Sequence, residues 1–160
     1  MSRAFVKDET VAEAVETVLP ERPISPHPNL VTASGLKALE QALLSARDAL
    51  ATAAKATDAI ERKRLSATPA RDIRYLSERL TTAQLVTPAP SPETVGFGNS
   101  VKLEYDDGRT VTYRIVGEDE ADPAKGIISY VSPVARALIG QRVDEAVTVA
   151  GREIVILQIS

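Results

Sequence analysis

The chain has 160 residues, of which 44% are hydrophobic and 26% charged, and its formal net charge is −3, a composition typical of globular proteins. No apolar run reaches the roughly 18 residues of a membrane helix, and the N-terminus lacks the apolar core of a secretion signal, so we expect a cytoplasmic protein without membrane contact. The chain has no cysteine and one histidine, which excludes a disulfide framework and thiolate catalysis and leaves few nucleophile–base pairs.

Residues 1–31 are predicted to form an extended tail. The prolines of this segment fall close together, at Pro20, Pro23, Pro26 and Pro28. Each proline fixes its own φ and disfavours helix at the residue before it. A short helix is expected over residues 8–18. His27 lies among the prolines, where a catalytic or ligand role is disfavoured.

Residues 32–86 carry the spacing of an antiparallel helical hairpin. A first seam repeats at alternating intervals of three and four residues and comprises Leu36, Leu39, Leu43, Ala46, Leu50, Ala53, Thr57 and Ile60. A second seam with the same spacing comprises Ile73, Leu76, Leu80 and Ala83. Thr32 or Ser34 can cap the first helix, because a hydroxyl accepts hydrogen bonds from the unpaired N–H groups there. Two narrow seams close in sequence predict two helices that pack on each other as a coiled coil.

The position of the hairpin tip follows from the lengths of the two arms. Helices of equal length with ends near Gly35 and Gln84 meet at about residue 59 or 60, which places the tip within residues 56–61. Pro69 leaves two alternatives, since proline is tolerated in the first turn of a helix and costs roughly 3 kcal/mol inside one. We favour a second helix that begins at Thr68 and Pro69 after a loose tip over one that begins earlier and kinks.

Residues 87–94 form a proline-rich linker, and residues 95–160 carry the period-two alternation of β-strands. Strands are predicted over residues 101–105, 111–115, 127–131, 147–149 and 154–157. Ser132 as N-cap, Pro133 at the first helical position and Gly140 after the end predict one short helix. The predicted fold is a two-domain α+β protein, in which the helical hairpin precedes a small antiparallel sheet with one helix.

Two stretches of the C-terminal domain, together with the hairpin before them, resemble a known family. Residues 113–122 read YRIVGEDEAD, and residues 132–140 read SPVARALIG. Shorter matches at the two ends of the hairpin and at the start of the sheet are Leu30-Val31-Thr32, Gly35-Leu36, Ala83-Gln84-Leu85-Val86 and Val95-Gly96-Phe97-Gly98. From about residue 30 to residue 160, the chain is similar to the Gre family of bacterial transcription elongation factors.

The resemblance implies a division of labour between the two domains. The C-terminal domain, FKBP-like in shape, would dock on the rim of the secondary channel of RNA polymerase, and the hairpin would enter the channel. The polymerase-facing surface would include Glu118, Asp119, Glu120, Ser132 and Pro133. We expect the protein to be a monomer.

The resemblance also implies a chemical role for the hairpin tip. In members that stimulate transcript cleavage, two acids spaced D-x-x-E help to hold a second Mg²⁺ in the active centre of the polymerase, which hydrolyses the RNA. Asp58 and Glu61 have this spacing and lie at the predicted tip. The chain is then not itself an enzyme, and it has no metal or cofactor of its own, because the Mg²⁺ belongs to the polymerase.

Alternatives to these roles stay open. Asp58 and Glu61 are ordinary solvated charges if Arg62, Lys63 and Arg64 pair with them and oppose a bound divalent ion. Relative to the family, the hairpin is shorter by about a heptad per helix, or ~10 Å, which favours a channel-binding regulator of the Rnk type without cleavage activity. The three cations can also contact nascent RNA or acidic channel walls.

A peptidyl-prolyl isomerase is the least favoured alternative. An FKBP-like shape alone suggests it, but the binding pockets of such enzymes are lined by aromatic side chains. The C-terminal domain offers only Phe97, Tyr105, Tyr113 and Tyr130.

Overall fold

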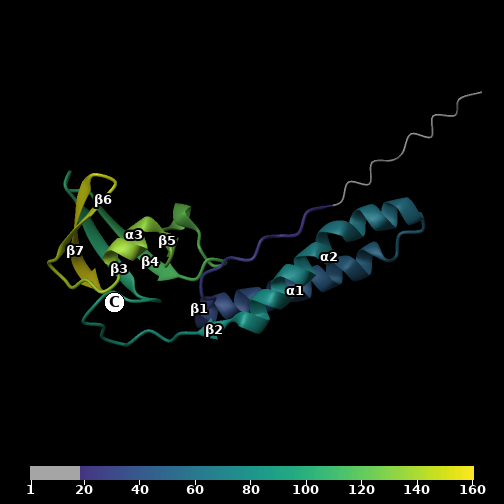
Figure 1. The fold of residues 1–160 in the computed structure, drawn as a ribbon, viewed down its shortest axis with the longest axis horizontal. Coiled ribbons are helices and arrows are strands. Elements are labelled where there is room, and N and C mark those ends of the chain that lie inside the picture. The colour runs from purple at the N-terminus through teal and green to yellow at the C-terminus, as the bar shows by residue number, and fades with distance from the viewer. Residues whose placement is uncertain (1–18) are drawn as a thin grey trace, which may run out of the picture.

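A computed structural model of the chain consists of a helical hairpin and a β-sheet head, and it describes residues 19–160 (Figure 1). The hairpin projects from one end of the head, so the molecule is elongated and the hairpin tip lies far from the sheet (Figure 1). This architecture confirms the predicted order of hairpin, sheet and short helix. The helix predicted over residues 8–18 lies outside the described residues. Within the described part of the chain, no helix is long and apolar enough to span a bilayer.

The first helix, α1 (Ala33–Ala53), begins at one of the two predicted caps. Thr32 has extended backbone angles, and its Oγ1 accepts a hydrogen bond from the N–H of Gly35 at 3.0 Å. The hydroxyl thereby satisfies an N–H that has no carbonyl partner within the helix. At the other end, the N–H of Ala54 donates to the carbonyl of Leu50 at 3.0 Å and closes the last turn.

The second helix, α2 (Ala59–Thr82), starts well before the predicted position. Asp58 is its N-cap and accepts from the N–H of Glu61 at 3.0 Å, so the tip is confined to residues 54–58. The prediction of a helix start next to Pro69 is wrong, because Pro69 lies inside α2. A proline removes one N–H and disturbs one turn, whereas the residues before it gain several intrahelical hydrogen bonds and packing against α1.

The hairpin is packed most tightly at its base, next to the head. One apolar cluster there joins both helices and comprises buried Val31, Leu39, Leu43 and Leu76, with Leu36, Ala46, Ile73, Tyr75, Leu80 and Ala83 packed against it. Toward the tip, Ala53 is the last buried member of the first seam. Thr57 and Ile60 do not continue that seam as predicted, since α1 ends before both of them and Ile60 is 80% exposed.

Two short strands close the base of the hairpin. β1 (Leu30–Val31) lies just before α1, β2 (Gln84–Leu85) lies just after α2, and the two strands pair in parallel. The N–H of Gln84 also donates to the carbonyl of Asn29 at 2.8 Å. Residues 30–31, which the sequence assigns to the end of the tail, therefore form part of the hairpin base.

The head is built on one five-stranded sheet in the order β5-β4-β3-β7-β6. Its strands, in chain order, are β3 (Ser100–Tyr105), β4 (Thr110–Val116), β5 (Ile127–Ser129), β6 (Ala146–Val149) and β7 (Arg152–Ile159). All pairings are antiparallel except that of β4 with β5, which is parallel. A parallel neighbour needs a crossing connection, and residues 117–126, with the 3-10 helix η1 (Pro123–Lys125), provide it. The acidic residues 118–120 lie in this connection.

The helix α3 (Pro133–Leu138) packs against the sheet and completes the head. Its caps match the prediction, since Oγ of Ser132 accepts from the N–H of Ala135 at 3.3 Å and Gly140 follows the helix end with a φ of +87°. The buried core of the head comprises Val95, Val101, Leu103, Ile115, Ile128, Ala135, Leu138, Ile154 and Ile156. This core holds the β4–β5 connection in place next to the hairpin.

Replacing Pro69 with alanine should stabilise the hairpin, because alanine restores the N–H that the interior of α2 lacks at this position. We expect the free energy of unfolding, measured by urea denaturation and circular dichroism, to rise by about 1–3 kcal/mol. Pro133→Ala is the matched control, since Pro133 occupies the first turn of α3, where proline is tolerated. If the two substitutions have equal effects, Pro69 causes no strain in α2.

Candidate functional site at the two ends of the hairpin

The two acids predicted at the tip lie together in the first turn of α2. Asp58 caps the helix through Oδ2, and Glu61 supplies the N–H that it accepts. The guanidinium of Arg64 donates to both carboxylate oxygens of Glu61, from Nε at 2.8 Å and from Nη2 at 2.6 Å. These hydrogen bonds lower the pKa of Glu61 below its usual value. Glu61 is therefore ionised at neutral pH.

Both tip carboxylates are within reach of a partner molecule, since Asp58 is exposed and the side chain of Glu61 is 44% exposed. An exposed ion pair contributes only about 0–1 kcal/mol, so a divalent cation can displace Arg64 from Glu61. Arg62 instead donates to the carbonyl of Ala56 at 2.8 Å and closes the tip loop. Within residues 19–160, no group of three or more His, Cys, Asp or Glu side chains could hold a metal ion.

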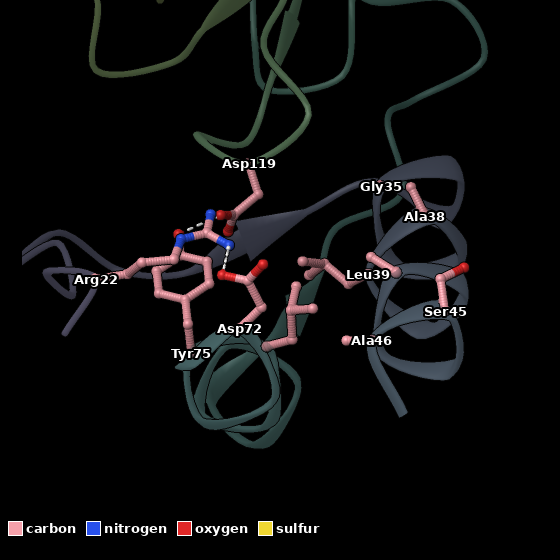
Figure 2. A pocket seen from close by; sticks show the side chains of 11 residues that line it. Arg22, Gly35, Ala38, Leu39, Ser45, Ala46, Asp72, Tyr75 and Asp119 are labelled. Carbon is pink, nitrogen blue, oxygen red and sulfur yellow. Dashed lines mark hydrogen bonds and ion pairs between the residues drawn. The ribbon is translucent and has the colours of Figure 1, made fainter. Parts of the chain in front are cut away.

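At the other end of the hairpin, the acidic connection of the head faces the hairpin base (Figure 2). Asp119 accepts a hydrogen bond from Nε of Arg79 at 2.6 Å and another from the hydroxyl of Tyr75. The side chain of Arg79 is 2% exposed and that of Asp119 is 16% exposed, so this ion pair is largely removed from solvent. Moving the head away from α2 would leave the buried charge of Arg79 without its partner, which is strongly destabilising. The ion pair therefore holds the head against α2.

Glu120 joins the head to the first turn of α1. Its two carboxylate oxygens accept hydrogen bonds from the hydroxyls of Thr32 at 2.6 Å and Ser34 at 2.7 Å. The Thr32 hydroxyl thereby has two functions, because its oxygen also caps α1. The backbones meet here as well: a β-carbon on Gly117 would lie 2.2 Å from the carbonyl oxygen of Leu30. We call these contacts of residues 117–120 with the hairpin base the module junction.

A groove of about 580 Å³ lies beside the module junction, between α1 and α2 (Figure 2). Small side chains of α1 line one side, and Asp72, Tyr75 and the side chain of Arg22 line the other. The guanidinium carbon of Arg22 lies 3.8 Å from the centre of the Tyr75 ring. Burial, together with the hydrogen bond to Asp119, raises the pKa of Tyr75 to about 12. The Tyr75 hydroxyl therefore remains a donor at neutral pH.

Comparison with known proteins identifies the family of the chain. The sequence profile described as "Transcription elongation factor, GreA/GreB, C-term" matches residues 89–160. Transcription elongation factor GreB of Pasteurella multocida (strain Pm70) is 40% identical over 136 residues, and the match covers 76% of this chain and 86% of that protein. The chain belongs to the GreA/GreB family of transcription elongation factors.

Further relatives match over shorter stretches. GreB of Haemophilus influenzae is 51% identical over 80 residues, which cover 49% of this chain and 51% of that protein, so the match spans about half of the relative. Among solved structures, GreA factor homolog 1 (Gfh1) of Thermus thermophilus is 24% identical, with 82% of this chain and 97% of that chain covered and a TM-score of 0.40. Family membership confirms the resemblance drawn from residues 113–122 and 132–140.

The remaining residues that the family resemblance singles out lie on the head. Glu118 precedes the junction acids and accepts a hydrogen bond from Oγ of Ser25 at 3.0 Å. Ser132 uses its hydroxyl to cap α3, whereas Pro133, in the first turn of that helix, is exposed. Of these three residues, Pro133 is the one that a docking partner can contact most directly.

Sequence reasoning missed the hairpin side of the module junction, which consists mainly of Thr32, Tyr75 and Arg79. One signal existed. Arg79 follows Leu76 by three residues and therefore lies close to the apolar seam of α2, where a buried cation needs an acidic partner. The partner, Asp119, is 40 residues away in the sequence, so only the fold could identify it.

Removing the junction carboxylate should destabilise the protein, because Asp119→Ala leaves the buried guanidinium of Arg79 without its partner. We expect a loss of about 3 kcal/mol in the free energy of unfolding, measured by chemical denaturation. Asp106→Ala is the matched control, since Asp106 pairs with Arg152 at an exposed site, where the expected loss is about 0–1 kcal/mol. Equal losses in the two variants would contradict a special role for the junction.

The raised pKa of Tyr75 predicts a fall in stability at alkaline pH. The unfolded tyrosine loses its proton near pH 10, whereas the folded one keeps it until about pH 12. The contribution of Tyr75 to the free energy of unfolding is therefore complete below pH 10 and is lost as the pH rises to about 12. Tyr75→Phe should flatten this part of the stability curve, measured by denaturation at each pH. Parallel curves for parent and variant would assign the fall to the other tyrosines.

Proposed function

We propose that the chain binds RNA polymerase as a transcription elongation factor and places its hairpin in the secondary channel of that enzyme. The observation that carries the proposal is the projection of the hairpin from the head (Figure 1). Its helices have 21 and 24 residues, which corresponds to lengths of roughly 32–36 Å. A narrow rod on a compact head suits an action at a distance from the docking surface. Membership of the GreA/GreB family supports the same function.

In this proposal the head docks on the polymerase, and its named residues have two different tasks. Ser132 and Pro133, at the start of α3, contact the polymerase together with Glu118. Asp119 and Glu120 contribute by another route, because both carboxylates bind the hairpin base and thereby set the direction of the hairpin.

At the tip, Asp58 and Glu61 act on a Mg²⁺ ion that the polymerase holds. Carboxylate oxygens are the hard ligands that Mg²⁺ prefers. A second metal ion assists phosphodiester hydrolysis by activating water or by stabilising the leaving oxygen. The chain therefore stimulates cleavage of a backtracked transcript by its partner, and no step of the reaction takes place on a metal of its own.

A second candidate function, a channel-binding regulator without cleavage activity, is favoured by the state of the tip acids. Glu61 holds Arg64 through two hydrogen bonds, and Asp58 uses one oxygen for the helix cap. Both interactions compete with a metal ion for carboxylate oxygens. Such a regulator occupies the channel and excludes other factors that bind there.

Three subsidiary proposals follow from the assignment of RNA polymerase as partner. A single hairpin fills a single channel, so the chain acts as a monomer. Bacterial RNA polymerase acts in the cytoplasm, which places the chain there too. The cations of residues 62–64 contact nascent RNA when the tip lies in the channel, since phosphates attract clustered Lys and Arg side chains.

The test uses RNA polymerase halted in a backtracked position on a template with end-labelled RNA. We expect the purified chain to bind this complex and to shorten the RNA. Asp58→Ala combined with Glu61→Ala should lower the rate of shortening by roughly 10- to 100-fold, the range typical of groups lost from a metal site, while binding is retained.

The control removes two exposed acids from the shaft of α1, by Glu40→Ala combined with Asp48→Ala, and should leave shortening unchanged. If the chain binds and displaces a known cleavage factor without shortening the RNA, the second candidate function is correct. If it does not bind the polymerase at all, both candidates are wrong.

A further inference from the structure

The segment before the hairpin contacts both modules, and we propose that it fixes the direction in which the hairpin leaves the head. This segment, residues 20–29, is named the strap. It begins beside the middle of α2 and runs along that helix to the hairpin base (Figure 1). The contacts of the strap, and its effect on the hairpin direction, concern this chain alone. Only the importance of that direction for the action of the tip rests on the proposed function.

On the hairpin side, the strap is attached to α2 at the residues that line the groove. Nη1 of Arg22 lies 3.4 Å from a carboxylate oxygen of Asp72, and its guanidinium stacks on the ring of Tyr75 (Figure 2). Glu21 adds an ion pair with Arg74, but both side chains are more than half exposed, so this pair contributes little. The contact of Arg22 with an aromatic face is therefore the main attachment to this part of α2.

On the head side, the strap is attached at two points, one in the β4–β5 connection and one just after β5. Oγ of Ser25 donates to Glu118 at 3.0 Å, at the start of the connection. The hydroxyl of Tyr130, just after β5, donates to the carbonyl of Pro28. Strap residues three positions apart thus hold two points of the head.

The C-terminal end of the strap is fixed to the hairpin by a buried side chain, that of Asn29. Asn29 is 5% exposed, and its Nδ2 donates to the carbonyl of Arg79 at 2.7 Å and to Oγ1 of Thr82 at 3.1 Å. Arg79 therefore takes part in both contacts: its side chain binds Asp119 of the head, and its carbonyl binds the end of the strap. Prolines at four positions of the strap, Pro20, Pro23, Pro26 and Pro28, reduce the conformational freedom that is lost when it binds.

The arrangement works as a clamp because the strap adds contacts between the head and the hairpin to those that already exist. The proline-rich linker after β2 is the covalent connection, and at the module junction Asp119 and Glu120 bind the hairpin base. The strap crosses from α2 to the head at another place and opposes rotation of the head about the base. At ~32 Å from the base, a rotation of about 10° displaces the tip by about 6 Å, more than twice a Mg–O distance of ~2.1 Å.

The test measures the direction of the hairpin in the free protein, so its outcome does not depend on polymerase binding. Cysteines are introduced by Thr57→Cys in the tip and Lys102→Cys on the sheet, and each carries a spin label. The chain has no cysteine of its own, so no other position is labelled. Pulsed electron paramagnetic resonance then gives the distribution of distances between the two labels. We expect one narrow peak for the otherwise unchanged chain.

The strap is loosened by Arg22→Ala, which removes its main attachment to the middle of α2, combined with Tyr130→Phe, which removes one of its two attachments to the head. We expect the peak to broaden or to gain a second maximum, since each lost hydrogen bond lowers the ratio of fixed to displaced hairpins about fivefold. Tyr130→Phe alone, which removes a single hydroxyl, should give a smaller change in the same direction.

The matched control makes the same chemical changes within the head, by Arg109→Ala and Tyr113→Phe. Arg109 lies over the ring of Tyr105, and the hydroxyl of Tyr113 contacts that of Tyr105, so neither change touches the strap. A peak that stays narrow in the strap variant overturns the proposal. So does a peak that is already broad in the parent, or one that broadens equally in the control.

Discussion

The relation between the two modules depends on the ion pair between Arg79 and Asp119. The guanidinium is almost completely removed from water, and a charge in that position is tolerated only while it keeps its partner. Because Arg79 lies on α2 and Asp119 on the β4–β5 connection, the need to pair a buried charge becomes a constraint on where the head sits. Glu120 adds a second constraint, since the hydroxyl that it binds is also the cap of α1.

The same residue type serves opposite purposes at the two ends of the hairpin. At the base, carboxylates are largely buried and bonded to groups of the other module, so exchanging their partners is costly. At the tip, Asp58 and Glu61 are accessible, and their partners belong to the same turn of helix. Solvent weakens that pairing, which leaves the tip acids available for a cation brought by another molecule. A rigid base and an exchangeable tip are the combination that the proposed insertion requires.

Local patterns predicted most of the secondary structure. The seams, the Thr32 and Ser132 caps and the alternating strands all depend on residues within a few positions of one another. The predicted start of α2 was wrong because the hydrogen bonds of the turns before Pro69 stabilise the helix by more than the one proline destabilises it. The parallel pairing of β5 could not be read from alternation, because a strand has the same pattern in either direction. The tip acids were found by spacing, whereas their pairing with Arg64 and the helix cap required coordinates.

The sequence by itself determined two helices, a small sheet, the approximate position of the tip and the family. These features follow from hydrophobic periodicity, capping residues and short motifs, all of which act over short separations. Only the tertiary structure decided that the acidic run faces the hairpin base and that residues 20–29 join both modules. Contacts of this kind link groups 40 or more positions apart, and no local propensity specifies them, because the cost of burying Arg79 arises only once the core has formed.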